Sequence, residues 1–200
     1  VVVSGRVKTM NESIYYNVDR LHDAIAKNSQ ITFRYFDWGL HGERCYRPGK
    51  YTASPYALCW EDENYYLVAH SARHGLTHYR VDKMASITQT GEPRLLGSDY
   101  EGLDLSKYGK SVFGMFRGAP TTVRLRFENA LSGVVIDRFG RDVMLVPDGA
   151  EHFTLTADVA VSPLFYAWLA SFGPCVRILY PPSVVDDYVN YIDSTLEAYR

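Results

Sequence analysis

Apolar and polar positions in the first half of the chain predict one helix followed by several short strands. In "NVDRLHDAIAKN" apolar residues recur at helical spacing after Asn17, which we expect to be the helix N-cap. Apolar and polar residues then alternate in "QITFRYFDW", "YTASPYALCW", "NYYLVAHS" and "THYRVDKMASI", and "GLHGERCYRPGK" forms a polar loop between the first two. Short strands packed this densely after one helix predict a small β-barrel.

In the second half of the chain, strand-like and helix-like patterns of apolar residues alternate, and they predict the element order β-α-β-β-α-β-α. Its strands are expected at "TTVRLRFE", on both sides of a Pro-Asp-Gly turn, and at "CVRILYP". Its helices are expected at "NALSGVVIDRFG", ending at Gly140, at "SPLFYAWLASFGP", with Ser162 as N-cap, and at the end of the sequence. This order is that of a split, ferredoxin-like βαββαβ domain, so the whole chain is predicted to be of the α+β class.

The closing segment "SVVDDYVNYIDSTLEAY" predicts an amphipathic helix with one apolar stripe. We expect the stripe to join the core of the second domain, and a spare apolar edge could instead form a homodimer contact. The stripe consists of Val185, Tyr188, Ile192, Leu196 and Tyr199.

The regular pattern weakens between the two halves, where glycine is frequent and only a short helix around "LDLSKYGKSV" is suggested. We therefore expect a linker remnant at 1–13, a helix with a barrel at 14–95, a connector at 96–120 and the ferredoxin-like domain at 121–200. The sequence lacks an initiating Met, which we expect of a fragment or a processed chain.

Composition narrows the class of protein. Hydrophobic residues make up 46% and charged residues 22%, as in a globular domain, and the net charge of −2 confines any polyanion to a local patch. Three distant cysteines without a CxxC pair predict a reducing compartment and no structural zinc site. "VVVSGRVKTM" is too short for a signal peptide core or a membrane span. We therefore expect a cytoplasmic protein without membrane contact.

The segment "DENYYLVAHSARHGLTHYRVDKMASI" concentrates rings and cations on a predicted hairpin. Strict alternation places Tyr66, His70, His78 and Arg80 on the face opposite the apolar residues, while Lys83 lies at the strand end. A guanidinium can bind a phosphate or a base edge through paired hydrogen bonds, and rings can stack on bases. This face therefore predicts a platform for a nucleotide or single-stranded nucleic acid.

Other interpretations of these residues stay open. Arg80 could pair with Asp62 or Asp82 on a solvated surface while the tyrosines pack. His70, His74 and His78 have the spacing of a metal site on a helix, but Gly75 and the strand pattern interrupt any helix, so we expect no metal and no cofactor.

Catalysis is a further alternative. Cys59 is a conceivable nucleophile of a hydrolase, but it lies in an apolar strand, and no GxSxG, Walker or GxGxxG motif is present, so we expect no enzyme. In the second half a basic group either forms a solvated surface or continues a nucleic-acid path. Its members are Arg124, Arg126, Arg138 and Arg141.

The stretch "SPYALCWEDENYYLVAHSARHGLTHYRVDKM" resembles the core of the WYL domain. Tyr65-Tyr66-Leu67 stand in place of the Trp-Tyr-Leu triplet, and "YRVDKM" is similar to the Phe-Arg-Leu-Asp-Arg-Ile segment of that family. The second half, with "DRFG", "FYAWLASFG" and the closing helix, resembles the C-terminal extension, WCX, that commonly follows a WYL domain.

The resemblance implies an Sm-like, SH3-type β-barrel followed by a ferredoxin-like domain. It implies the effector-sensing region of a bacterial transcription regulator, usually a homodimer that contacts promoter DNA through a helix-turn-helix absent from this chain. The implied effector is single-stranded nucleic acid or a nucleotide, and the implied ligand positions are Ser54, Tyr56, Tyr66, Arg80 and Lys83, to which alternation adds His70 and His78. A stand-alone accessory module that binds single-stranded RNA and modulates a nucleoprotein is the alternative function.

Overall fold

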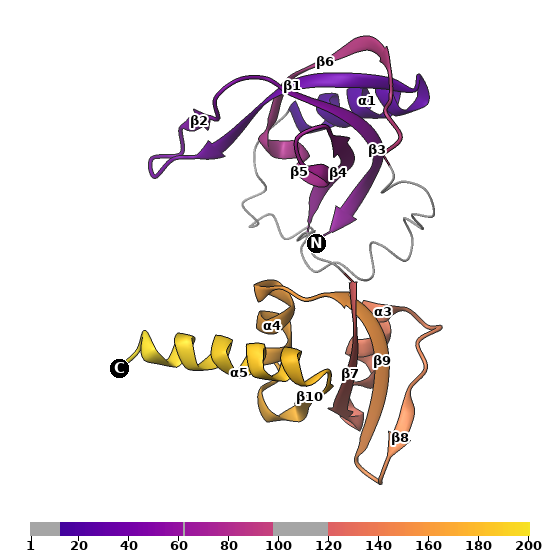
Figure 1. Cartoon of the computed structure of the whole chain (residues 1–200), viewed down its shortest axis with the longest axis vertical. Coiled ribbons are helices and arrows are strands. Elements are labelled where there is room, and N and C mark those ends of the chain that lie inside the picture. The colour runs from indigo at the N-terminus through magenta and orange to yellow at the C-terminus, as the bar shows by residue number, and fades with distance from the viewer. Residues whose placement is uncertain (1–12, 62, 98–119) are drawn as a thin grey trace, which may run out of the picture. The chain divides into compact units, whose positions relative to one another are not determined.

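The computed structural model describes residues 13–61, 63–97 and 120–200. Contacts within the chain divide it into two compact units, Val1–Leu103 and Asp104–Arg200, shown in Figure 1. The linker remnant expected at 1–13 lies almost entirely outside the described residues. The same holds for most of the connector expected at 96–120, including its short helix.

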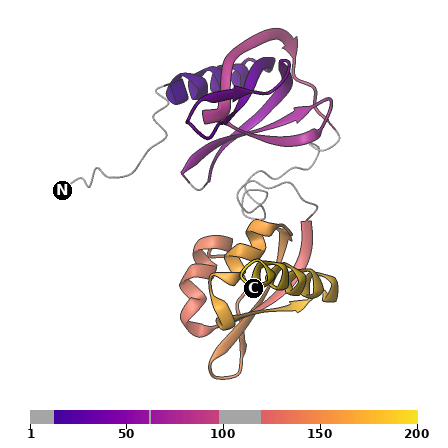
Figure 2. The same ribbon diagram turned by 90° about the vertical axis from the view of Figure 1, so that its left-hand side faces the viewer.

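The first unit is one helix on a curled antiparallel sheet. The strands follow the order β2-β1-β3-β4-β5, and β6 pairs with β1, so the sheet curls back on itself. Helix α1 packs against β3, β6 and the short helix η1, and Figure 2 shows it lying across one end of the sheet. The elements are α1 (Ser13–Ala26), β1 (Ser29–Trp38), β2 (Arg44–Tyr46), β3 (Tyr51–Glu61), β4 (Asn64–Ser71), β5 (Gly75–Arg80), η1 (Val81–Lys83) and β6 (Met84–Pro93).

Alternation along the strands builds the core of this unit. Ile31, Phe33, Leu67 and Tyr79 face inward beneath Leu21 of α1 and are all buried. Four rings meet there with centroid separations of 5.0–6.3 Å, and most of the pairs are edge-to-face or tilted, as aromatic quadrupoles prefer. This aromatic cluster consists of Phe33, Tyr35, Tyr51 and Tyr79.

Three local predictions for the first unit are wrong in detail. The expected polar loop contains β2, which extends the β1 hairpin through pairs such as Phe36 with Tyr46. The strand expected over "THYRVDKMASI" is interrupted by η1, so Lys83 lies on a helical turn between β5 and β6. Asn17 is buried within α1 and does not cap it, because the helix begins four residues earlier.

The second unit has the predicted order of elements. Its antiparallel sheet runs β10-β7-β9-β8, with Val123, Leu125 and Phe127 of β7 buried against the helices. Ser162 caps its helix as expected, because its hydroxyl accepts a hydrogen bond from the Phe165 amide at 3.2 Å. The elements are β7 (Pro120–Glu128), η2 (Asn129–Leu131), α3 (Ser132–Phe139), β8 (Val146–Asp148), β9 (His152–Ala160), α4 (Pro163–Ala170), η3 (Gly173–Cys175), β10 (Val176–Tyr180) and α5 (Pro182–Glu197).

Helix α5 joins the core of its unit along its first half only. Val184 is buried, and Val185, Tyr188 and Tyr191 pack against the core. The predicted stripe is wrong beyond this point, because its last members are exposed where the helix extends away from the sheet (Figure 1). These exposed residues are Ile192, Leu196 and Tyr199, together with Val189. No helix among the described residues is long and apolar enough to cross a membrane.

The buried amide of Asn17 attaches α1 to the sheet. Its side-chain nitrogen donates to the carbonyl oxygens of Met84 at 2.9 Å and Val81 at 3.2 Å. Because Asn17→Ala removes both bonds at a buried position, it should lower the free energy of unfolding by about 1–3 kcal/mol. Urea unfolding followed by resonances of the first unit measures this. Asp19→Ala, at an exposed position of the same helix, should change it by less than about 0.5 kcal/mol, and an equal loss in both variants would contradict the assignment.

Candidate ligand-binding face

The side of the β3-β4-β5 sheet opposite the aromatic cluster, here called the outer face, carries most of the predicted ligand residues. The strand register places Tyr66 opposite Arg80 and Val68 opposite His78, while His70 pairs with Ser54 and Leu76. Residues that oppose each other across a sheet lie on the same face. The structure therefore brings Tyr66, His70, His78 and Arg80 together, as alternation predicts.

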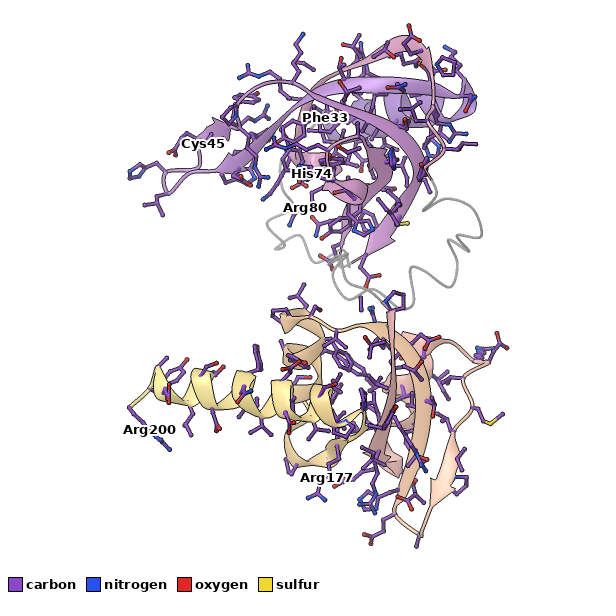
Figure 3. The ribbon with its side chains drawn as sticks, in the orientation of Figure 1. Phe33, Cys45, His74, Arg80, Arg177 and Arg200 are labelled. Carbon is purple, nitrogen blue, oxygen red and sulfur yellow. The ribbon has the colours of Figure 1, made fainter. Side chains whose placement is uncertain are left out.

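Arg80, which is labelled in Figure 3, is held in place by two neighbours. Its Nε and Nη2 donate to the two carboxylate oxygens of Asp82 at 3.0 and 2.8 Å, and Nη2 also donates to Asn64 Oδ1 at 2.7 Å. Asp82 is 2% exposed and Arg80 34%, so the pair is buried on the carboxylate side and open on the guanidinium side. The Asp82 carboxylate is the main cause that raises the pKa of Arg80 above its usual value.

Within the described residues, Nη1 of Arg80 donates no hydrogen bond. The guanidinium has five N–H groups in one plane, and its three other N–H groups belong to Nε and Nη2. The pairing with Asp82 that the sequence offered as an alternative is therefore present, and it fixes the orientation of a group whose Nη1 edge can still bind a ligand.

Lys83 belongs to a second charged group beside the first. Its Nζ lies 3.1 Å from Asp37 Oδ1, and Arg47 Nε lies 2.8 Å from Asp37 Oδ2. Tyr35 connects the two groups, since its hydroxyl accepts a hydrogen bond from the Arg80 amide at 3.1 Å while the Arg47 guanidinium lies 5.2 Å from its ring centroid. The five ionic groups sum to a single positive charge, so the electrostatic attraction for a polyanion is modest here.

Ser54 and Tyr56 are buried and bind a segment of this chain. Leu95 N donates to Ser54 Oγ at 2.9 Å, the Tyr56 hydroxyl donates to Leu95 O at 3.1 Å, and Gly97 N donates to the Tyr56 oxygen at 3.0 Å. Arg94 adds a hydrogen bond from Nη1 to Pro55 O at 2.8 Å. The four residues 94–97, here called the strap, are thus fastened along β3.

The strap also touches His70. A β-carbon added to Gly97 would lie 2.5 Å from Nδ1 of the His70 ring, so only glycine fits at this approach. Ser54, Tyr56 and His70 therefore support the strap in this structure. A ligand that used their polar atoms would have to displace it, whereas Tyr66, His78, Arg80 and Lys83 are partly exposed.

Some residues of the site were missed by the sequence interpretation. The sequence predicts Asp82 only as a possible ion-pair partner that would occupy Arg80 on a solvated surface. In the structure Asp82 is buried and orients the guanidinium. Asn64 carried no signal, since it begins β4 in a turn-like segment. Asp37 and Arg47 come from the hairpin of β1 and β2, and their spacing gave no sign that they approach Lys83, because that contact depends on the curl of the sheet.

The structure also bears on the alternative chemistries. Burial raises the pKa of the Cys59 thiol, with Glu61 as a smaller cause, and this disfavours the thiolate that a nucleophile requires. Among the residues that the structure describes, no group of three or more His, Cys, Asp or Glu side chains could hold a metal ion.

The basic group of the second unit is partly compensated. Arg126 pairs with Asp148 at 2.7 Å and lies opposite Arg177 of β10, while Arg124 and Arg141 are exposed. Arg124 and Arg126 lie on the side of β7 opposite its buried residues, as alternation predicts. Whether this group continues a ligand path stays a prediction.

Comparisons with known proteins identify both units. Residues 16–89 match the WYL domain and residues 119–196 match the WCX domain. A search of curated proteins found no match. Among solved structures, proteasome accessory factor B/C (PafBC) of Arthrobacter aurescens matches with 20% identity and a TM-score of 0.38 over 98% of this chain and 28% of that chain. A CRISPR Cas-related protein matches with 12% identity and a TM-score of 0.49 over 93% of this chain and 52% of that chain.

The contact between the strap and His70 can be tested by a double-mutant cycle. Gly97→Ala places a methyl group against the imidazole, so it should destabilise the first unit by about 1–3 kcal/mol, the usual cost of overpacking. In a His70→Ala background the same change should cost less than about 0.5 kcal/mol. Urea unfolding of the four proteins gives the coupling. Equal costs in both backgrounds would show that the strap does not lie on His70.

Stability at high pH tests the burial of Tyr35. Burial raises the pKa of Tyr35 to about 12 from 10.0, chiefly by desolvation. As pH rises, the Tyr35 hydroxyl therefore loses its proton in the unfolded chain before it does so in the folded protein. The contribution of the neutral hydroxyl to the free energy of unfolding is complete below pH 10 and is lost as pH rises through about 12. The loss should be about 2–3 kcal/mol. Urea unfolding at several pH values between 9 and 12 measures this loss. Tyr35→Phe should make the free energy of unfolding depend less steeply on pH over this range. An unchanged slope in the variant would contradict the assignment.

Proposed function

Because this chain belongs to the WYL family, with a WYL domain followed by a WCX domain, we propose that it is the effector-sensing region of a bacterial transcription regulator. Its outer face binds single-stranded nucleic acid or a nucleotide. The family assignment supports a regulatory binding module, and the geometry around Arg80 supports the choice of ligand.

In finer detail, we propose that the curled sheet is an Sm-like, SH3-type barrel and that the second unit is ferredoxin-like. The closure of β1 on both β3 and β6 supports the first assignment. The sheet order β10-β7-β9-β8 supports the second, because numbering these strands within their unit gives 4-1-3-2, with a helix after the first and third strands.

The observation that carries the proposal is the oriented guanidinium of Arg80. Asp82 and Asn64 hold one side of it, and Nη1 can donate to a phosphate or to a base edge. Tyr66 stands directly opposite Arg80 in the register and offers a ring for stacking, and His78 lies two residues further along the same face. Lys83 supplies a cation that Asp37 already partly neutralises.

The charge balance predicts how such a ligand binds. With one net positive charge in the two groups, hydrogen bonds and stacking contribute more than long-range attraction, so the salt dependence of binding should correspond to only one or two phosphate contacts. This suits a short single strand or a nucleotide better than a long polyanion. We infer binding without catalysis, in keeping with the raised pKa of Cys59.

The strap supplies a route from the outer face to the rest of the protein. A ligand that hydrogen-bonds to the hydroxyl groups of Ser54 and Tyr56 in place of the strap competes with Leu95 and Gly97, which lead along the sequence toward the WCX domain. Ligand binding then favours one arrangement of the attached parts over another. In a longer protein these parts include a helix-turn-helix that contacts promoter DNA, and the cytoplasm is the proposed compartment. The exposed apolar end of α5 is the proposed homodimer contact.

Arg80 is the residue whose removal tests the proposal. In fluorescence anisotropy with short labelled single-stranded DNA and RNA, Arg80→Ala should weaken binding by about 1–3 kcal/mol and reduce the salt slope by about 0.7, the share of one phosphate contact. Because this change leaves the buried Asp82 carboxylate unpaired, a second variant, Arg80→Gln with Asp82→Asn, keeps a neutral hydrogen-bonded pair. It should lose the same affinity while remaining folded.

Arg126→Ala is the matched control. Arg126 is 33% exposed, close to the 34% of Arg80, and pairs with Asp148 at 2.7 Å, but its carboxylate partner is exposed whereas Asp82 is buried. We expect this variant to bind like the wild type. An equal loss in both variants would show that binding is not confined to the outer face, and the absence of binding by the wild type at modest salt would refute the oligonucleotide proposal.

A further inference from the structure

A small cavity lies at the opposite end of the β4-β5 hairpin from Arg80. Its volume is about 240 Å³, and it is formed where the turn between β4 and β5 meets the start of β3. Gly75, with φ of +62°, closes the turn and pairs with Ser71. The lining includes Lys50, Tyr51, Thr52, Ser71, Arg73 and His74.

The cations of this cavity differ from those of the outer face. Lys50 and Arg73 are exposed, and within the described part of the chain neither has an ion-pair partner. The residues that line the cavity include no Asp or Glu. By contrast, Arg47, Arg80 and Lys83 are each bound to a carboxylate. Two uncompensated cations around one concave site repel each other, and a bound anion relieves this repulsion.

The rest of the lining suits an anion that carries a ring or a sugar. The Tyr51 ring stacks on Phe33, with centroids 5.5 Å apart and an interplanar angle of 22°, and it also contacts the Tyr79 ring edge-to-face, so the ring is fixed in position. Pro48 adds a second apolar wall. The exposed Thr52 contributes a hydroxyl that can donate to an oxyanion.

We propose that this cavity binds a single phosphate group, as a nucleoside monophosphate or as one phosphate of a single strand, with Lys50 and Arg73 as its cationic contacts. The volume falls below the 300 Å³ or so of ordinary small-ligand sites, so one phosphate with its sugar fits and a dinucleotide does not. This site is separate from the outer face, because the six residues of β5 place Arg80 about 17 Å from Gly75.

Titration of the whole chain with inorganic phosphate at constant ionic strength tests the site directly. Amide resonances of residues 50–52 and 71–75 should shift together in nuclear magnetic resonance spectra, with one dissociation constant. The double variant Lys50→Ala with Arg73→Ala should weaken this binding at least tenfold. Both positions are exposed, so the variant should remain folded.

The control variant, Lys27→Ala with Arg177→Ala, removes the same number of exposed cations elsewhere (Arg177 is labelled in Figure 3). It should bind phosphate like the wild type. Shifts scattered over the cationic surface, or an unchanged titration in the Lys50 and Arg73 double variant, would overturn the proposal. Arg80→Ala should leave the phosphate-induced shifts of residues 50–52 and 71–75 unaltered, whatever it does to the outer face, so failure of this site can be told apart from failure of the outer face.

Two further probes distinguish the sources of the phosphate. If the ligand is a monophosphate, adenosine monophosphate should bind through the cavity and adenosine should not, and a 5′-phosphorylated oligonucleotide should bind more tightly than its 5′-hydroxyl form. If a backbone phosphate is bound instead, the two oligonucleotides should bind alike, and both should lose affinity in the Lys50 and Arg73 double variant. If every phosphorylated probe kept its full affinity in the Lys50 and Arg73 double variant, neither a monophosphate nor a backbone phosphate would be the ligand of this cavity.

Discussion

The WYL unit depends on the aromatic cluster formed by Phe33, Tyr35, Tyr51 and Tyr79. Their rings share one core at contact distances, and the Tyr35 hydroxyl reaches the backbone of Arg80 at its edge. There Tyr35 accepts a hydrogen bond from the Arg80 amide, and the Arg47 guanidinium lies over the Tyr35 ring, while Tyr51 lines the cavity. A single packed core therefore positions the outer face, the hairpin of β1 and β2, and the lining of the cavity, which is one physical reason for so many tyrosines in a small domain.

Charge compensation distinguishes the two candidate binding regions. On the outer face each cation is oriented by a carboxylate, so specific geometry replaces long-range attraction. Around the cavity the cations are uncompensated and exposed, an arrangement that favours a compact anion. A chain with a net charge of −2 can thus offer two different modes of recognition on one hairpin, because each depends on local pairing and not on total charge.

The strap changes the meaning of the ligand positions implied by the family resemblance. Ser54 and Tyr56 are polar residues whose hydrogen bonds are directed at Leu95 and Gly97. Burying such groups without partners would cost free energy, so the bonds to the strap stabilise the unit whether or not a ligand is bound. A residue can therefore hold the protein together in one state and contact an effector in another, and the His70–Gly97 cycle measures the first of these roles.

The sequence by itself determined the order of elements in the second unit, the inward and outward sides of the strands, and the grouping of Tyr66, His70, His78 and Arg80, because alternation and capping are local properties of the chain. Only the tertiary structure decided the contact of Asp37 with Lys83, the strap on Ser54 and Tyr56, the burial of Asn17, and the exposed end of α5. The first three features join segments that are far apart in sequence, and they follow from the curl of the sheet. The exposed end of α5 follows from how far along the helix the core of the second unit extends. Local periodicity encodes neither.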